Sequence, residues 1–406
     1  MKKSILIISS DYTGHGHKSI TDSLKEQFRK HAGVEVHVVD GFALGGNVGL
    51  KIGKLYGSVT RNAKELWKIF WDIAIRTPVL MNEFMEISVR DSFLKLIQEV
   101  KPDLIICVHA NFNGSLLNIM KKNKLNIPFV VLIADLVTIT PLWADPRADY
   151  TICPTIESKY KCLEFGVPES KLRVIGFPSR EKFCDHLLKK QDKPIKHDLF
   201  EKDFTEIPIN CLIMSGGEGV GNMRRVAEIL LKNFNCRVKI IAGRNKMLKT
   251  RLELTLKEKY NDRVEIFGFV ENVQDFMLES DITFVRGSPN VMMEAVLCNT
   301  PMVITGALPG QEEGNPGYAE KYNLGVVCKE LKNLKKVVSG LLTDNAKMLK
   351  QIRESQRNFR NPDIAGEIVN FLLNIEKGET VVSHLPRKKF RRIDSIRSFV
   401  QKAGKH

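Results

Sequence analysis

Short apolar runs alternate along this chain with segments of helical periodicity, and the alternation begins at the first residues. Residues 3–10 (KSILIISS) predict a buried strand, and Ile20, Leu24 and Phe28 lie on one face of a predicted helix. Residues 34–40 (VEVHVVD) predict a second strand. Strand–helix–strand units form parallel sheets, whose ligands bind at the carboxyl ends of the strands. The pattern continues, with further strands expected at 103–110, 127–136, 149–155 and 171–178.

A second series of strands and helices follows a polar, lysine-rich connection. It opens with an apolar strand and a glycine cluster within residues 210–223, and further strands are expected at 237–243, 264–270 and 281–287. Helices are expected between these strands and, after them, at 319–324, 330–343 and 345–359. We therefore predict an α/β protein with two doubly wound, Rossmann-like domains that face each other across a cleft. The predicted parts are an N-terminal domain at 1–178, a linker at 179–208, a C-terminal domain at 209–370, and a C-terminal helix with a basic tail at 371–406.

The amino-acid composition indicates how many domains the chain forms and which kind of partner it binds. A length of 406 residues with 43% hydrophobic content suits two globular domains. The net charge of +15 indicates an anionic partner, such as anionic lipid, nucleic acid or a phosphorylated substrate. The eight cysteines show neither CxxC pairs nor zinc spacing, which predicts reduced thiols in a cytosolic protein. The apolar run at 5–8 is too short for a signal peptide, and because no run reaches about 18 apolar residues, any membrane role should be peripheral.

One stretch, residues 285–317, has features that suit a nucleotide-activated sugar. Its pattern predicts a strand end followed by a helix that starts at Ser288, Pro289 and Asn290. The free N–H groups and positive dipole end of a helix start suit a phosphate. Glu294, one turn further on, suits the two hydroxyls of a ribose. An ordinary strand–helix–strand unit is the simpler alternative.

A polar loop closes the same stretch after one more short apolar strand. It presents an amide and a carboxylate side by side, at Gln311 and Glu312, with Gly310 before them and Asn315 after them. Amide and carboxylate groups together suit the hydroxyls of a sugar. The alternative is a solvated polar loop without a ligand.

Two regions of the N-terminal half are candidates for contact with lipid. The first is a glycine-rich apolar loop at 41–58, because exposed apolar loops are otherwise a liability. The second is a predicted helix at 64–75, for which a place in the core is the simpler interpretation and a place at a bilayer interface the alternative. The candidate lipid-contacting residues are Leu50, Lys51, Lys54, Trp67 and Trp71.

The C-terminal tail is strongly basic and carries apolar residues at roughly helical spacing. Arg391, Arg392 and Phe399 represent this pattern, which predicts a basic amphipathic helix on anionic lipid. A solvated tail is the simpler alternative. RNA would also suit the charge, but no nucleic-acid-binding module accompanies the tail, and we expect no nucleic-acid partner.

Several motifs together resemble the monogalactosyldiacylglycerol synthase and processive diacylglycerol glucosyltransferase family. The C-terminal half carries MSGGEGVG (214–221), GFV (268–270), MEAVLCNTPMVI (293–304) and PGQEEGN (309–315). The N-terminal half carries GHGHKSITDSL (14–24), LYGSVTRNAKELWK (55–68), ADLVTITPLWADP (135–146) and IGFPSREKF (175–183). The turn before the glutamate helix, usually Gly-Pro-Gly in the family, is Ser288-Pro289-Asn290 here. The resemblance implies the GT-B fold of glycosyltransferases.

The resemblance also implies an activity, which is inverting transfer of a hexose from a UDP-hexose to diacylglycerol. The N-terminal domain would take the acceptor, with His17 as the general base and Asp135 as the alternative base or orienting partner. The expected location is the cytoplasm, peripheral on the inner face of the cell membrane, with anionic lipids as further partners. A prenyl-linked or other lipid acceptor, and a non-catalytic nucleotide-sugar sensor, remain the alternatives.

The donor would bind to the C-terminal domain. Phe269 and Val270 would frame the uracil, Glu294 would bind the ribose, and the loop after it would bind the hexose. The groups expected near the diphosphate are Gly216, Gly217, Gly219, Gly221, Arg244 and the Ser288-Pro289-Asn290 turn. No metal and no cofactor are expected, because the site lacks a DxD motif and helix dipoles can stabilise the diphosphate.

Overall fold

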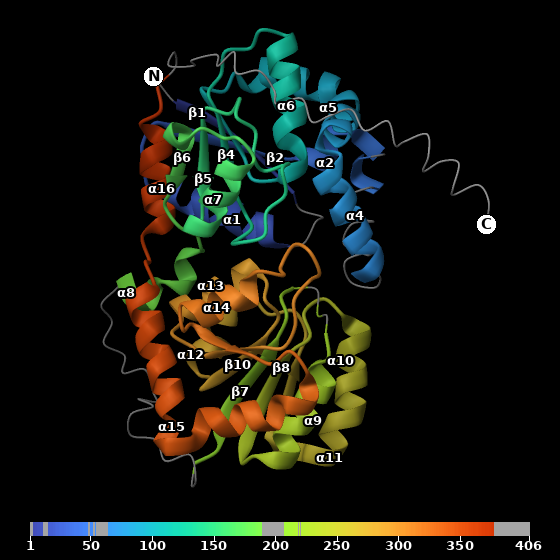
Figure 1. Cartoon of the computed structure of the whole chain (residues 1–406), viewed down its shortest axis with the longest axis vertical. Coiled ribbons are helices and arrows are strands. Elements are labelled where there is room, and N and C mark those ends of the chain that lie inside the picture. The colour runs from blue at the N-terminus through green and yellow to red at the C-terminus, as the bar shows by residue number, and fades with distance from the viewer. Residues whose placement is uncertain are drawn as a thin grey trace, which may run out of the picture.

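The computed structural model describes residues 3–10, 15–47, 49–51, 53, 64–188, 207–217, 219 and 221–376. These residues form two α/β domains that follow one another along the long axis of the molecule (Figure 1). Each domain contains one six-stranded sheet. The prediction of two doubly wound domains is therefore confirmed.

The N-terminal sheet has the strand order β2-β1-β3-β4-β5-β6, and every neighbouring pair is parallel. Its central strands read as unbroken apolar runs, such as Ile5–Ile8 and Leu104–Cys107, because helices cover both faces of a parallel sheet. The strands are β1 (Lys3–Ser9), β2 (Val34–Asp40), β3 (Leu104–Cys107), β4 (Phe129–Leu132), β5 (Tyr150–Cys153) and β6 (Leu172–Val174).

The helices of the N-terminal domain begin and end at local signals. Asp40 caps α2 by accepting hydrogen bonds from Phe42 and Ala43, and Thr155 caps α7 through a capping box with Ser158. α5 ends where Lys101 turns left-handed with φ 46°. The helices are α1 (His15–Phe28), α2 (Gly41–Leu44), α4 (Lys64–Arg76), α5 (Pro78–Val100), α6 (Ala110–Lys122), α7 (Ile156–Glu164) and α8 (Asp185–Leu188), with 3₁₀ turns η1 (Glu169–Lys171) and η2 (Glu181–Phe183).

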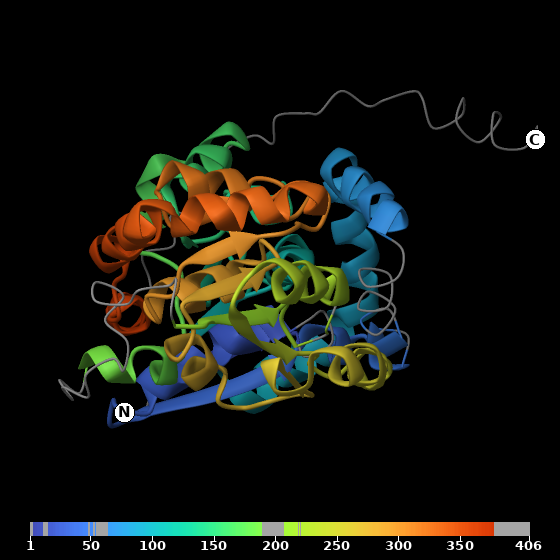
Figure 2. The same cartoon turned by 90° about the horizontal axis from the view of Figure 1, so that it is seen from below.

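The C-terminal sheet repeats the design with the order β12-β11-β10-β7-β8-β9. Its strands are β7 (Ile209–Met214), β8 (Cys236–Ile241), β9 (Val264–Phe267), β10 (Ile282–Val285), β11 (Met302–Ile304) and β12 (Gly325–Val327). Helices flank this sheet on both sides (Figure 2). They are α9 (Met223–Asn233), α10 (Lys246–Leu252), the π-helical turn η3 (Glu253–Lys257), α11 (Glu258–Tyr260), α12 (Val273–Leu278), α13 (Pro289–Leu297), α14 (Asn315–Lys321) and α15 (Leu334–Phe359), with 3₁₀ turns η4 (Asn261–Arg263) and η5 (Leu331–Asn333).

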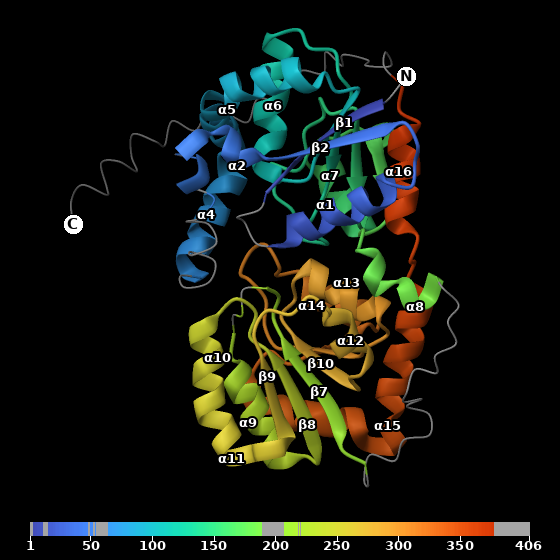
Figure 3. The same ribbon diagram turned by 180° about the vertical axis from the view of Figure 1, so that it is seen from behind.

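The last helix of the described chain, α16 (Ile364–Leu373), returns to the N-terminal domain. Figure 3 shows it beside the N-terminal sheet, far from the strands of the C-terminal one. Ile368 and Leu372 are fully buried in the N-terminal core, and Phe371 meets Tyr150 edge-on at 5.1 Å. The predicted C-terminal domain at 209–370 therefore extends too far, because α16 buries its apolar face on the other sheet.

One local prediction also needs correction. The segment from residue 41 is helical in α2 rather than a loop, because Phe42 is buried against the ring of Phe112. The two helices expected at 330–343 and 345–359 are confirmed, because α15 consists of two helices joined at a kink, where Asp344 and Asn345 have positive φ.

Candidate active site

A cavity of about 530 Å³ lies between the two domains. The carboxyl ends of the strands of parallel sheets converge on it, as expected for α/β folds. The N-terminal wall comes from the start of α1 and the end of β4, and the C-terminal wall from α13 and the loop after β11. Of the residues predicted from the sequence, those lining the cavity are His17, Asp135, Gly216, Gly217, Arg244, Phe269, Val270, Ser288, Pro289, Asn290, Glu294, Gln311 and Glu312.

His17 is buried in the N-terminal wall and is held in one orientation. Its Nδ1 lies 2.7 Å from the carbonyl oxygen of Val108, which can only accept a hydrogen bond, so Nδ1 carries the proton. Burial lowers the pKa of His17 to about 4, so that the ring is neutral near pH 7. A neutral ring protonated at Nδ1 leaves Nε2 with a free electron pair, which is the form a general base needs.

Aromatic rings surround His17. The ring of His109, at the end of β3, lies 4.5 Å from it, and that of Trp143 lies 6.3 Å away. His109 in turn meets Phe42 edge-on at 5.3 Å, and burial lowers its pKa well below the usual value. These contacts keep water from His17 and so preserve its neutral state. The sequence reasoning missed His109, which lies near the end of the strand predicted at 103–110.

Asp135 links the two walls of the cavity. Its carboxylate accepts a hydrogen bond from Trp143 Nε1 at 2.7 Å and another from Gln311 Nε2 of the C-terminal domain at 2.9 Å. Burial raises the pKa of Asp135 to about 6, although both hydrogen bonds favour its charged form. Both carboxylate oxygens accept a hydrogen bond, and the predicted role of Asp135 as a base or as the partner that orients His17 stays a prediction.

Glu294 is buried at the C-terminal wall, one turn into α13. Burial raises its pKa to about 7, and Arg180 and Lys182 oppose this rise with their charges. The Arg180 guanidinium lies 3.8 Å from the carboxylate, across the domain boundary. Both cations line the cavity and were missed as site residues, although they lie in the quoted IGFPSREKF motif.

The loop after β11 is held by a hydrogen bond within itself and by an ion pair to Arg286, which follows β10. Glu312 is buried, accepts a hydrogen bond from Leu308 N at 2.7 Å and pairs with Arg286 at 2.9 Å. Arg286 also lines the cavity, and the sequence reasoning missed it. Gln311 and Glu312 therefore face the cavity in fixed positions.

Asn315 and Gly310 are not among the residues lining the cavity. Asn315 is fully buried, and its Nδ2 donates to the carbonyl of Gly287 at 2.8 Å, so it fixes the start of α14 to the end of β10. The structure therefore gives Asn315 a structural role and does not support its predicted contact with the sugar. Gly310 lies instead against Trp71 of α4.

In the glycine cluster after β7, some of the predicted glycines line the cavity and others do not. Gly216 and Gly217 line the cavity, where Gly216 has φ 76°. Gly219 packs so closely on Ala242 that a Cβ would lie 1.9 Å from its carbonyl oxygen. Neither Gly219 nor Gly221, whose φ is 101°, lines the cavity, and both serve the turn.

The place expected for the uracil lies at the end of β9. Arg244 stacks on the ring of Phe269 at 4.1 Å, and Phe269 is half exposed. The turn before α13 faces the start of α1 across the cavity, because a Cβ on Gly16 would lie 2.8 Å from Asn290 Nδ2. The structure brings these groups together, while their roles toward a donor stay predictions.

The residues predicted to contact lipid divide into three groups. Trp67 and Trp71 are buried against Leu308 of the C-terminal domain, so the lipid prediction is wrong for them, whereas Ile69 and Ile75 of the same helix are exposed. Leu50 is half-buried and Lys51 is exposed. Lys54, Arg391, Arg392 and Phe399 lie outside the described residues.

Exposed apolar side chains also occur on α5. Leu80, Phe84 and Ile87 are exposed by 53%, 55% and 80%, and they follow one another at helical spacing. No helix among the described residues is long and apolar enough to cross a membrane. In the same part of the chain, no group of three or more His, Cys, Asp or Glu side chains is arranged to hold a metal ion.

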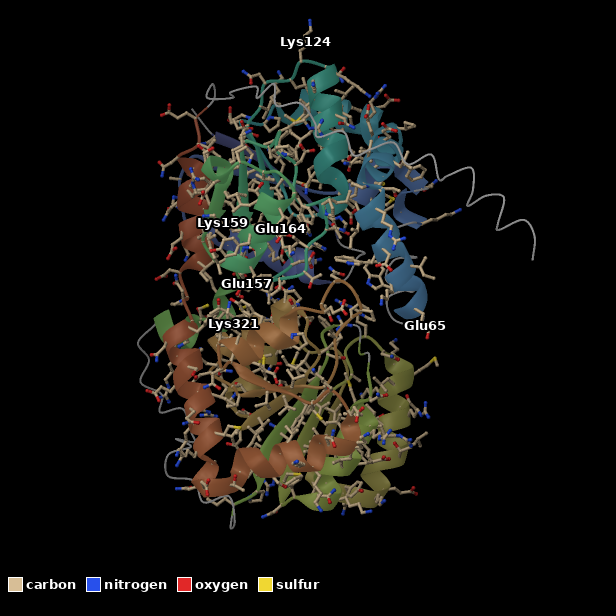
Figure 4. All side chains as sticks on the ribbon, in the orientation of Figure 1. Glu65, Lys124, Glu157, Lys159, Glu164 and Lys321 are labelled. Atoms are coloured by element: carbon tan, nitrogen blue, oxygen red, sulfur yellow. The ribbon has the colours of Figure 1, made fainter. Side chains whose placement is uncertain are left out.

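An ion pair joins the domains away from the cavity. Lys321 of α14 lies 2.6 Å from Glu157 of α7, and the hydroxyl of Tyr322 donates to the same carboxylate. Figure 4 shows Glu157 and Lys321 close together at the domain boundary.

Comparisons with known families divide the chain as its fold does. The sequence profile of monogalactosyldiacylglycerol (MGDG) synthase matches residues 17–178, and that of glycosyl transferases group 1 matches residues 218–359. The first match covers the N-terminal sheet from α1 onward, and the second covers most of the C-terminal domain.

Curated relatives are similar over nearly the whole chain. The probable monogalactosyldiacylglycerol synthase 2 of Oryza sativa subsp. japonica is 27% identical over 95% of this chain and 83% of its own length. The monogalactosyldiacylglycerol synthase 2 of Arabidopsis thaliana is 26% identical over 90% and 80%. The processive diacylglycerol beta-glucosyltransferase of Bacillus cereus is 25% identical over 95% and 96%.

Solved structures share the fold at low sequence identity. Acinetobacter baumannii MurG aligns with a TM-score of 0.60 at 13% identity, over 92% of this chain and 100% of its own. The S. aureus MnaA–UDP complex aligns with a TM-score of 0.58 at 16% identity, over 91% and 96%. The predicted resemblance is thus confirmed: over nearly its whole length the chain is similar to monogalactosyldiacylglycerol synthases and to a processive diacylglycerol glucosyltransferase, and it has the GT-B fold.

Proposed function

We propose that this protein is a hexosyltransferase that moves a hexose from a UDP-hexose to the hydroxyl of diacylglycerol. One observation carries the proposal: the interdomain cavity has a neutral histidine on one wall and groups that suit a sugar nucleotide on the other. The names of the relatives supply the acceptor, since they are named for the synthesis of monogalactosyldiacylglycerol and for glucosyl transfer to diacylglycerol. The β linkage named for the bacterial relative corresponds to inversion of an α-linked UDP-hexose.

His17 is the proposed general base. The acceptor hydroxyl donates its proton to Nε2 of His17 while its oxygen forms a bond to the anomeric carbon of the hexose. The bond between that carbon and the diphosphate breaks, and its electron pair leaves with UDP. Nδ1–H, fixed by Val108, keeps the ring oriented as it becomes charged. Asp135 orients Trp143 and Gln311 beside this reaction centre.

The leaving diphosphate gains negative charge, and cations of this chain would stabilise it. Arg180, Lys182 and Arg244 line the cavity, and the first turn of α13 adds backbone N–H groups without an intrahelical acceptor. Preorganised donors of this kind lower the barrier where charge develops. We therefore propose a reaction that uses no metal ion and no cofactor.

The donor's other parts have candidate partners on the same wall. Glu294 would accept hydrogen bonds from the ribose hydroxyls, and Gln311 and Glu312 would bind the hexose. Phe269 and Val270 would frame the uracil beside Arg244. These groups come from α13, from the loop after β11 and from the segments after β8 and β9, so donor binding requires the C-terminal domain to be complete.

The protein is proposed to act as a peripheral protein on the inner face of the cell membrane. Diacylglycerol resides in bilayers, so the acceptor must be taken from a membrane surface. The stripe formed by Leu80, Phe84 and Ile87 on α5 is exposed apolar surface in the acceptor domain. A net charge of +15 would add attraction to anionic lipids.

The test is glycolipid synthesis by the purified full-length protein. We would supply UDP-glucose or UDP-galactose, and diacylglycerol in vesicles with or without anionic lipid, and then identify the product and its anomeric linkage by NMR. A β-linked hexosyl-diacylglycerol is expected with one of the donors. Product on a prenyl-linked acceptor alone would replace the proposed acceptor. Donor binding without product on any lipid would favour the sensor.

A further inference from the structure

Helix α4 belongs to the N-terminal domain by sequence, but its tryptophans pack on the C-terminal domain. Trp67 and Trp71 are exposed by only 7% and 8%, and their rings lie 6.1 Å apart. Their buried cluster is completed by Leu308, on the loop after β11, which is exposed by 4%. The helix therefore forms a hydrophobic contact across the domain boundary.

The fit between Trp71 and this loop depends on a glycine. A Cβ on Gly310 would lie 2.4 Å from Cδ1 and 2.7 Å from Cγ of the Trp71 indole, closer than carbon atoms can approach. Gly310 also has φ 80°, a conformation that favours glycine. The indole thus rests directly on the backbone of the loop.

The same segment of loop carries the groups assigned to the hexose. Gln311 follows Gly310 directly, and Leu308 N donates to the Glu312 carboxylate at 2.7 Å. The N-terminal domain contacts the loop at two further points, where Gln311 binds Asp135 and where Gly314 N donates to Thr138 Oγ1 at 3.0 Å. The loop of the donor domain is therefore shaped by contacts from the acceptor domain.

We propose that Trp71 is a positioning residue for the hexose part of the donor, an inference that rests on the proposed function. By fixing Leu308 and Gly310, the indole holds Gln311 and Glu312 toward the cavity. The nucleotide part of the donor does not depend on this contact, because its candidate partners lie on α13 and after β9. The proposal therefore separates recognition of the hexose from recognition of UDP.

The experiment compares the affinities for UDP and for UDP-hexose by calorimetry on the full chain. Trp71→Ala should weaken UDP-hexose binding by about tenfold while leaving UDP binding within about twofold, because roughly one strong hydrogen bond to the hexose is lost. Trp71→Phe keeps a ring against Gly310 and should restore most of the difference. Ile69→Ala, an exposed residue of the same helix, is the matched control and should change neither affinity.

A second variant tests the contact from the other side. Gly310→Ala places a methyl group in the indole and should reproduce the selective loss of UDP-hexose affinity. In the Trp71→Ala background the same change should cost less, since the strain at φ 80° is common to both measurements and cancels in the cycle. If Trp71→Ala yields no folded protein, the same cycle with Trp71→Phe and Gly310→Ala replaces it.

The outcomes separate this inference from the proposed function. Equal loss of UDP and UDP-hexose affinity, or no loss of either in Trp71→Ala and Gly310→Ala, would overturn the positioning role while leaving the transferase intact. A wild-type chain that binds neither ligand would overturn both. Additive effects of the two substitutions would show that Trp71 does not act through Gly310.

Discussion

The two walls of the cavity differ in the chemistry of the side chains around the proposed reaction centre. The N-terminal wall holds His17 among aromatic rings, away from water and without charge. The C-terminal wall holds Arg244 and Arg286 together with a helix N-terminus, and Arg180 faces this wall from the other side of the domain boundary. The difference matches two tasks, because proton transfer needs a neutral base and a diphosphate needs fixed positive charge.

The contrast also explains why the domains must meet. Neither wall alone holds both a base and a donor site, and the contacts Asp135–Gln311 and Arg180–Glu294 tie one wall to the other. Substitutions on the N-terminal wall should therefore affect turnover, and those on the C-terminal wall should affect donor binding. Four predictions test this separation.

The largest effect is expected at His17. His17→Ala removes the proposed base and should lower kcat by about 10²–10⁴-fold, while the affinity for UDP-hexose stays unchanged. Steady-state kinetics with calorimetry in parallel would measure both quantities. His31→Ala, after the end of α1 and outside the cavity, is the control. An equal loss of kcat and donor affinity would show that the walls are not separate.

The next effect is expected at Glu294. Glu294→Ala should weaken UDP-hexose binding by about 1.5–3 kcal/mol, the range for a hydrogen bond to a charged group. Glu313→Ala changes an exposed neighbour of Glu312 that does not line the cavity, and it should leave calorimetric affinity unaltered. If both variants bind the donor like the wild type, the ribose assignment is wrong.

Donor binding should also depend on pH. The pKa of Glu294 is raised to about 7, so below that pH the carboxyl is largely protonated and accepts ribose hydroxyls poorly. Affinity for UDP-hexose should rise several-fold between pH 6 and pH 8, with a proton released on binding below pH 7. Calorimetry in buffers of different ionisation enthalpy measures this release.

A variant without the titrating carboxyl supplies the control for that pH dependence. Glu294→Gln should bind UDP-hexose with nearly constant affinity over the same range. Asp135, with a pKa of about 6, titrates at lower pH and would leave a residual slope between pH 5 and 6. A rise in affinity as steep in Glu294→Gln as in the wild type would assign the titration to another group.

The smallest effect is expected on the outer surface of α5. Replacing Ile87 by Ser removes an exposed apolar side chain and should weaken vesicle binding by about 1 kcal/mol, part of the transfer energy of a buried aliphatic side chain. Co-sedimentation with diacylglycerol vesicles measures the change, and UDP affinity should stay the same. Val174→Ser, on β6, offers an exposed apolar residue elsewhere in this domain as a control.

Most of the fold could be predicted from the sequence because its signals are local. Strand and helix patterns lie within a few residues, and the candidate residues His17, Asp135 and Glu294 lie in the segments that come after β1, β4 and β10. In parallel sheets such positions share one edge, so their convergence on the cavity follows from the topology.

The contacts that the sequence could not predict join segments far apart in the chain. Trp71 looked suited to a bilayer because an apolar helix face does not say what covers it, and its partner Gly310 lies in the other domain. Asn315 looked like a sugar ligand because a polar residue in a loop does not reveal the carbonyl of Gly287 that it binds. Long-range packing and hydrogen bonds decided both positions.

The return of α16 to the first sheet has a consequence for how the protein is made. Ile368 and Leu372 complete the core that β1 begins, and the Lys3 ammonium group binds the carbonyl of Leu373. During synthesis on the ribosome the C-terminal domain emerges whole before this last piece of the first domain is available. The N-terminal domain can therefore finish folding only after nearly all of the chain has been translated, and a fragment that stops at residue 178 would leave its core open to water.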